Sequence, residues 1–307
     1  MRPLVLKFSC FWADSASINK RMVENWGEPP ERFTLTDSDE FDFLVSLSHS
    51  REMKSTPKEK NIAVTMEPSW SPNSPKSLPS HCKYVITSDK NIKGKNVFHE
   101  YTFMLHHDSR NNHETGYTKG RSREEYLTNL HLRNDIDSKS YPKKLSMFIA
   151  NHGTLSGSST HPDSLYSARE NLLLKILKSD LDIDIYGIGW NIQDSRYKGS
   201  ANMKSDGLSD YKYSICMENS REDLYLSEKF IDVFLNNCVP IYWGCKNVAD
   251  AYPSDSFIEL DPSMEDPISF LKEQVDKPIS FRNDALQEAK RLYFDKYNLF
   301  NYLNDLL

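Results

Sequence analysis

One stretch in the second half of the chain decides the fold. It reads Tyr211-Lys-Tyr-Ser-Ile-Cys-Met-Glu-Asn-Ser220, then Tyr225-Leu-Ser-Glu-Lys229, and later Val239-Pro-Ile-Tyr-Trp-Gly244. The apolar run 213–217 predicts a buried strand that delivers residues 218–220 at its carboxyl end. Ser227 is a good N-cap for a helix predicted over 225–236, and 239–243 predicts a second strand. Alternation of this kind is typical of a parallel sheet covered by helices.

The same alternation extends in both directions from this stretch. Apolar runs predict strands at 4–8, 41–47, 62–66, 84–87, 144–151, 182–186 and 257–260. A helix is predicted over 164–178, another near 123–132, and the tail 281–307 is predicted to be helical throughout. We therefore predict an α/β protein with two domains, 1–140 and 143–280, followed by helices at 281–307 that can cross back to the first domain.

The overall composition limits the functions to consider. The 307 residues include 38% hydrophobic and 12% aromatic residues, enough for two packed cores. The formal net charge of −6 leaves no excess of Lys and Arg to release counterions from a nucleic-acid backbone. We expect no nucleic-acid partner, although a local basic pocket for a phosphate is compatible with this charge.

Cysteine usage and hydropathy indicate where the protein resides. The five cysteines are odd in number, scattered, and form no Cys-x-x-Cys motif, which favours reduced thiols. No segment approaches the ~20 apolar residues of a membrane span, and the run 4–8 is too short for a signal peptide. We expect a soluble, cytoplasmic protein without a membrane anchor.

The start of the helix at Ser227 is the most informative place for chemistry. A helix N-terminus after a strand presents free N–H groups and partial positive charge, which suit a diphosphate. Lys229 would add a formal charge, and the Glu228 carboxylate could accept hydrogen bonds from ribose hydroxyls. The alternative from spacing alone is that Glu228 complements the helix dipole and Lys229 is a solvated surface residue.

These motifs resemble the signature of the α1,3-fucosyltransferase family, glycosyltransferase family 10, and most closely its bacterial-type soluble members. The matching positions are Tyr211, Lys212, Tyr213, Glu218, Asn219, Ser220, Tyr225, Glu228, Lys229, Val239, Pro240 and Gly244. The resemblance implies a GT-B fold, in which two Rossmann-like domains face a cleft. It also implies inverting, metal-independent transfer of L-fucose from GDP-fucose to a hydroxyl of an oligosaccharide. The acceptor would bind mainly to 1–140 and the donor to 143–280.

Two weaker matches extend the resemblance. Phe148-Ile-Ala-Asn151 followed by Arg169 resembles the family segment whose Arg contacts the donor phosphates. Ile62-Ala-Val-Thr-Met-Glu67-Pro-Ser resembles the strand that ends in the family's presumed general base, although many members have Glu-Ser-Pro or Glu-Asn there. The resemblance thus implies Glu67 as base, and Glu228 or Glu218 as the carboxylate that eases positive charge on the sugar ring. It implies donor contacts from Arg169, Glu218, Asn219, Tyr225, Glu228 and Lys229.

Other motifs point to different chemistry. Asp-x-Asp pairs, which hold Mn²⁺ or Mg²⁺ in another large class of sugar transferases, occur at Asp37/Asp39, Asp135/Asp137 and Asp182/Asp184. Their settings in turns, loops and an alternating strand favour ordinary surface carboxylates. His106, His107, Asp108 and His113 suggest a metal cluster, but adjacent side chains on an extended strand point to opposite faces, so either one of these histidines touches the acceptor or none has a role. We expect no metal and no other cofactor. A different donor, such as a nucleotide-linked xylose or another deoxysugar, and a non-catalytic glycan- or nucleotide-binding protein remain alternatives.

Overall fold

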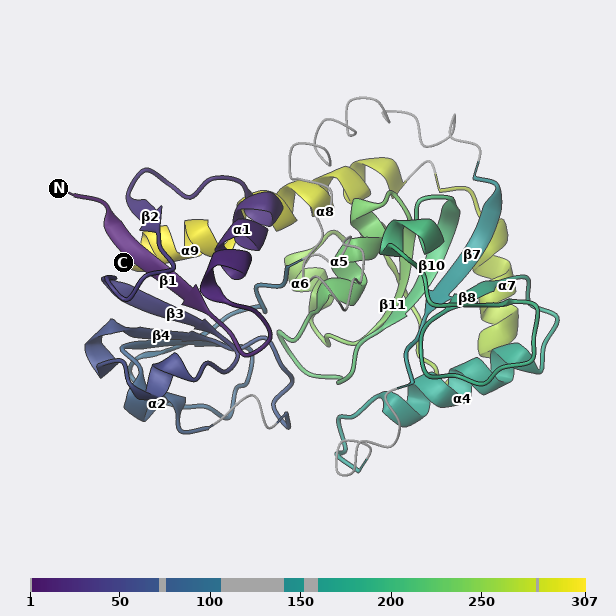
Figure 1. The fold of residues 1–307 in the computed structure, drawn as a ribbon. Coiled ribbons are helices and arrows are strands. Elements are labelled where there is room, and N and C mark those ends of the chain that lie inside the picture. Colours follow the sequence, from purple (N-terminus) through teal and green to yellow (C-terminus); the bar gives the residue numbers. More distant parts are fainter. Residues whose placement is uncertain (1, 72–75, 106–140, 152–159, 280–281) are drawn as a thin grey trace.

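Two parallel sheets make up the described part of the chain. The computed structural model describes residues 2–71, 76–105, 141–151, 160–279 and 282–307. The first sheet has the order β2-β1-β3-β4-β5-β6 and the second the order β12-β11-β10-β7-β8-β9. Each sheet forms one half of the molecule (Figure 1), and within the described residues all strand pairs are parallel. The predicted α/β architecture is confirmed.

The first sheet spans the N-terminal third of the chain. Its strands are β1 (Leu4–Ser9), β2 (Phe33–Leu35), β3 (Phe43–Leu47), β4 (Asn61–Val64), β5 (Tyr84–Thr87) and β6 (Val97–His99). The accompanying helices are α1 (Ser15–Trp26) and the short α2 (Leu78–His81). Asp14 caps α1 by accepting from Ser17 N, and Gly27 ends the helix at φ 83°. The sequence prediction omitted α1, although these two end signals were present.

The second sheet carries the stretch that decides the fold. Its strands are β7 (Lys143–Phe148), β8 (Asp184–Tyr186), β9 (Tyr197–Gly199), β10 (Tyr211–Met217), β11 (Val239–Trp243) and β12 (Ile258–Glu259). The helices are α4 (Tyr166–Leu177), α5 (Glu228–Leu235), α6 (Val248–Ala251) and α7 (Pro267–Asp276). Helix α5 begins three residues later than predicted, because Ser227 takes the capping position with extended backbone. The buried Phe230 and Phe234 pack this helix against Tyr242 and Tyr252.

The C-terminal tail is helical, as predicted, and consists of two helices separated by a short break. Helix α8 (Asn283–Asp295) ends before Asn298, whose side chain caps α9 (Leu299–Leu306) by accepting from Phe300 N. The Phe300 ring packs edge-on against Phe8 of β1 and Trp26 of α1, at centroid distances of 5.8 and 6.2 Å. Helix α8 therefore runs between the two halves, and α9 lies against the first sheet (Figure 1).

Candidate active site

A buried carboxylate holds the start of α5 in place. Glu218, at the end of β10, is 0% exposed. It accepts a hydrogen bond from Ser227 N at 2.7 Å, and both Ser227 Oγ and Tyr242 Oη lie within hydrogen-bond distance. Burial raises the pKa of Glu218, while Lys229 and the bonds from Ser227 oppose that rise. A Cβ at Gly244 would come within 2.2 Å of the Glu218 side chain, which explains why this motif position is glycine.

This location changes what Glu218 can do. The family resemblance implied that Glu218 contacts the donor, and that Glu218 or Glu228 stabilises positive charge on the sugar ring. In the structure it does not line the cavity beside α5, and it acts on the site through Ser227 and the helix start. Tyr225 is also buried and is likewise absent from the cavity wall. Both residues lie behind the cavity wall, and their donor contacts stay predictions.

A cavity of about 250 Å³ lies beside the start of α5. Its charged wall consists of Arg169, Lys204, Lys229 and Glu228, together with the amide of Asn219. The other wall follows the carboxyl ends of β7 and β8 and is lined by Phe148, Ile149, Ala150, Gly187, Ile188 and residues 200–202. Ligands of open α/β sheets bind at such strand ends. The cavity combines cations for a phosphate group with an apolar surface for the rest of a nucleotide.

Hydrogen bonds orient the cations of this cavity. Arg169 Nη1 donates to Asn219 Oδ1 at 2.6 Å, and burial lowers the pKa of the Arg169 guanidinium. Lys229 Nζ lies 3.1 Å from Glu228 Oε1 and 3.2 Å from Ser227 Oγ. Lys229 therefore faces the helix start and the cavity, which distinguishes it from the solvated surface lysine of the alternative interpretation.

Lys204 is a member of this site that sequence reasoning missed. Its Nζ bonds Asp232, one turn along α5, and lies 3.9 Å from Glu228 Oε1. It sits in a polar segment between β9 and β10 with no periodicity and no match to the motifs used above. Only the strand order, which puts β9 beside β8, shows that this segment reaches the cavity.

Glu67 lies in a second cavity, of about 260 Å³. The cavity is lined by Phe11, Trp12, Arg21, Met66, Glu67, Met104, Leu105 and Glu228. Burial raises the pKa of Glu67, and the charge of Glu228 adds to the rise while Lys229 opposes it. Glu228 lines both cavities, so the carboxylate that follows β4 and the cationic wall beside α5 belong to one continuous site.

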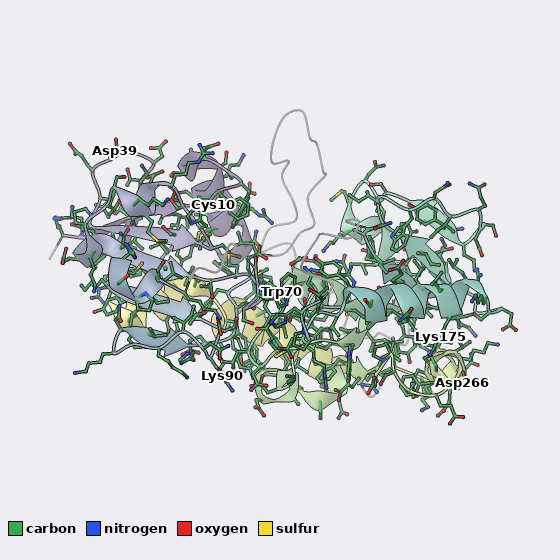
Figure 2. The ribbon with its side chains drawn as sticks, turned by 90° about the horizontal axis from the view of Figure 1, so that it is seen from below. Cys10, Asp39, Trp70, Lys90, Lys175 and Asp266 are labelled. Atoms are coloured by element: carbon green, nitrogen blue, oxygen red, sulfur yellow. The ribbon has the colours of Figure 1, made fainter. Side chains whose placement is uncertain are left out.

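The loop after Glu67 is fastened to the second half of the molecule. Ser69 N donates to both carboxylate oxygens of Glu222, at 3.2 and 3.1 Å, and Trp70 Nε1 donates to Ser220 Oγ at 3.0 Å. Trp70 lies between the two halves in Figure 2. The ring of Trp70 packs against His161 and Tyr166. These contacts fix Glu67 relative to α5.

Replacing Glu222 with alanine is expected to destabilise the protein. The half-buried Ser69 N–H loses its acceptor, and an unsatisfied buried donor costs about 1–3 kcal/mol of unfolding free energy. The midpoint of urea unfolding should fall for Glu222→Ala and stay unchanged for Glu265→Ala, which removes an exposed carboxylate near α7. Equal midpoints for the two variants would show that this contact does not hold the halves together.

Two carboxylates of the Asp-x-Asp pairs form ion pairs with lysines. Asp184 pairs with Lys143 and Lys198 at 2.6 and 3.1 Å, and Asp39 pairs with Lys7 at 3.0 Å. Among the described residues no group of three His, Cys, Asp or Glu side chains could hold a metal ion. Asp135, Asp137, the histidine-rich segment 106–113 and the helix predicted near 123–132 lie outside the described residues. Each of the five cysteines is free.

Solved structures of other proteins share this architecture. An α1,3-fucosyltransferase with GDP is 20% identical, with a TM-score of 0.56 over 97% of this chain and 88% of that one. An α-glucosyltransferase in complex with UDP and DNA is 10% identical, with a TM-score of 0.54 over 100% and 99%. At such identities the likeness shows the fold alone. Two facing Rossmann-like halves with a site at their strand ends define the GT-B class of glycosyltransferase folds, as predicted.

The second half of the chain is similar in sequence to a known family. Residues 155–276 match the C-terminal model of glycosyltransferase family 10 (fucosyltransferase), which confirms the predicted resemblance over this segment. An α-(1,3)-fucosyltransferase of Helicobacter pylori is 34% identical over 71 residues, which are 22% of this chain and 15% of that protein. An Arabidopsis thaliana α-(1,4)-fucosyltransferase is 32% identical over 76 residues, 24% and 19% of the two chains. The matched segments thus cover less than a fifth of these relatives.

None of the described helices combines the length and the apolar character that crossing a membrane requires.

Proposed function

We propose that this protein is an inverting fucosyltransferase that moves L-fucose from GDP-fucose to a hydroxyl of an oligosaccharide. The observation that carries the proposal is the position of Glu228, which lines both the cationic cavity and the cavity of Glu67. A donor in the first cavity would present its sugar to an acceptor in the second. The domain around the first sheet, residues 1–140, would bind the acceptor, and residues 143–280 the donor.

The cationic cavity suits the diphosphate of the donor. Arg169, Lys204 and Lys229 line it, and the partial positive charge at the N-terminus of α5 adds to their charge. When the bond between the sugar carbon and phosphate oxygen breaks, the electron pair leaves with GDP. Fixed cations stabilise this developing charge, and the protein's own groups supply what a metal ion would otherwise provide.

Glu67 is positioned to act as the general base. It would take the proton from the acceptor hydroxyl as the oxygen bonds to the sugar carbon on the face opposite to GDP, which inverts that carbon. A base works best when its pKa lies near the working pH, and the burial that raises the pKa of Glu67 acts in this direction. Glu228, between the two cavities, would ease positive charge on the ring in the transition state.

Binding of GDP is the first test of this proposal. At a hundred times its Kd, a ligand stabilises the folded state by about 2.7 kcal/mol. For a protein of this size that corresponds to a rise in Tm on the order of 5 °C. With EDTA present, GDP should raise the Tm more than equal concentrations of UDP or dTDP. A larger rise in Tm with UDP or dTDP would assign a different donor nucleotide. No rise with GDP, UDP or dTDP would contradict the proposed donor site.

A transfer assay then separates an enzyme from a binding protein. GDP-fucose and a panel of oligosaccharides are incubated with the protein, and fucosylated product is measured. Binding of GDP without consumption of GDP-fucose would indicate a non-catalytic nucleotide-binding protein that retains the fold.

A further inference from the structure

The exposed apolar side chains are concentrated at the two cavities. Among the described residues, the large hydrophobic side chains that are exposed are Phe11, Trp12, Leu174 and Ile188. Phe11 and Trp12 line the Glu67 cavity, Ile188 lines the cationic cavity, and Leu174 lies on the outer side of α4. Single exposed apolar residues are ordinary on a protein surface, but an adjacent aromatic pair inside a site is a common feature of ligand recognition.

The backbone holds the aromatic pair in place. Phe11 and Trp12 occupy the short turn between β1 and α1, at the carboxyl end of a central strand of the first sheet. Asp14 ends the turn by capping α1, and Cys10 Sγ lies 3.4 Å from the carbonyl oxygen of Ala13. Cys10, which precedes the pair, lies in the half that carries the first sheet (Figure 2). The turn therefore presents the rings from a fixed framework.

The two rings form an apolar part of the cavity lining. Their centroids are 5.0 Å apart and their planes meet at 86°, and the rings are 51% and 40% exposed. Met66, Met104 and Leu105 continue the apolar lining, and the polar groups are Glu67, Glu228 and the guanidinium of Arg21. A pyranose ring also has an apolar part and a polar part, because one face can present C–H groups while the rim carries hydroxyls.

We propose that Phe11 and Trp12 form the platform on which the ring of the acceptor sugar lies, an inference that rests on the proposed function. With its C–H face on the aromatic wall, the ring directs a hydroxyl to Glu67. The carboxylates of Glu67 and Glu228 outnumber the single guanidinium of Arg21 in this cavity, and this excess of negative charge disfavours an acidic sugar. The acceptor class assigned here is a neutral pyranoside that can present a C–H face to the aromatic pair, and the corresponding uronic acids are excluded.

Acceptor binding tests the platform directly. Calorimetric titration with methyl β-glycosides of N-acetylglucosamine, glucose and galactose, in the presence of GDP, is compared for wild type, Trp12→Ala, Phe11→Ala and Leu174→Ala. From the apolar area that each ring removes from water, we expect at least a roughly tenfold weaker glycoside affinity for the two aromatic variants. Leu174→Ala should bind like wild type. Trp12→Phe should recover most of the affinity, and GDP affinity should change less than about twofold in all variants.

The outcomes separate the platform from the proposed reaction. Glycoside binding that depends on Trp12 or Phe11, without fucose transfer, supports the platform and rejects the transferase activity. If fucose is transferred and the acceptor KM is the same for wild type and Trp12→Ala, the transferase activity is supported and the platform is overturned. The platform is also overturned if wild type binds none of the three glycosides, or if methyl β-glucuronide binds as tightly as the neutral glucoside.

Discussion

Replacing Glu67 with glutamine is expected to lower kcat for transfer by about 10²–10⁴-fold, the usual contribution of a general base. Glutamine keeps the size and polarity of the side chain in the cavity but cannot accept the acceptor proton. The cavity proposed for GDP is the neighbouring one, which Glu67 does not line, so the GDP-induced rise in Tm should persist. Initial rates with GDP-fucose and a glycoside acceptor measure the loss.

The pH dependence gives a second measurement of the same residue. Burial and the charge of Glu228 raise the pKa of Glu67 above the ordinary carboxyl value, against the opposing effect of Lys229. The base works only when ionised, so kcat/KM should climb with pH through an acid limb that lies above 4.5. Glu67→Gln should lose this limb.

A matched control is available in the same domain. Glu59→Gln changes an exposed carboxylate next to β4 and should leave both the rate and the acid limb intact. A loss below tenfold for Glu67→Gln, or an acid limb that survives the substitution, would mean that another group takes the proton.

The strands that the sequence predicted best are the ones buried on both faces. Strand β11 was predicted at its observed bounds and β5 likewise, because continuous apolar runs carry a clear signal. Strands β2, β6 and β9 were not predicted. Each has three residues, includes exposed or half-exposed positions, and owes its conformation to pairing with a neighbour, which short sequence windows do not show.

For the site, the sequence predicted residue types better than side-chain placement. The cavities contain Glu67, Arg169, Asn219, Glu228 and Lys229, all of which were selected from the motifs. The motif could not show that the buried Glu218 accepts a hydrogen bond from Ser227 N while its neighbour Asn219 lines the cavity. That division depends on the packing of β10 beneath α5, which only the tertiary structure provides.

Lys229→Ala is expected to lower kcat/KM for GDP-fucose by about 10²–10³-fold, the effect typical of removing one group that stabilises transition-state charge. The Lys229 ammonium lies at the start of α5, 3.1 Å from Glu228, on the wall of the cationic cavity. Without it the diphosphate loses a positive charge as the sugar–phosphate bond breaks. The GDP-induced rise in Tm should shrink as well. Lys175→Ala, on the exposed side of α4 (labelled in Figure 2), serves as the control and should match wild type.

The same substitution should alter the pH profile of a residue in the other cavity. Lys229 lowers the pKa of Glu67, so its removal leaves burial and Glu228 to raise that pKa further. The acid limb of kcat/KM should therefore move to higher pH in Lys229→Ala, and Lys229→Arg, which keeps the charge, should restore it. An unchanged acid limb would mean that Lys229 and Glu67 are too far apart to interact. It would contradict the proposal that the donor and acceptor cavities join at Glu228. The shift requires that the charge of Lys229, in one cavity, acts on Glu67, in the other. It therefore tests whether the two cavities form a single site more directly than the loss of activity in Glu67→Gln or Lys229→Ala does.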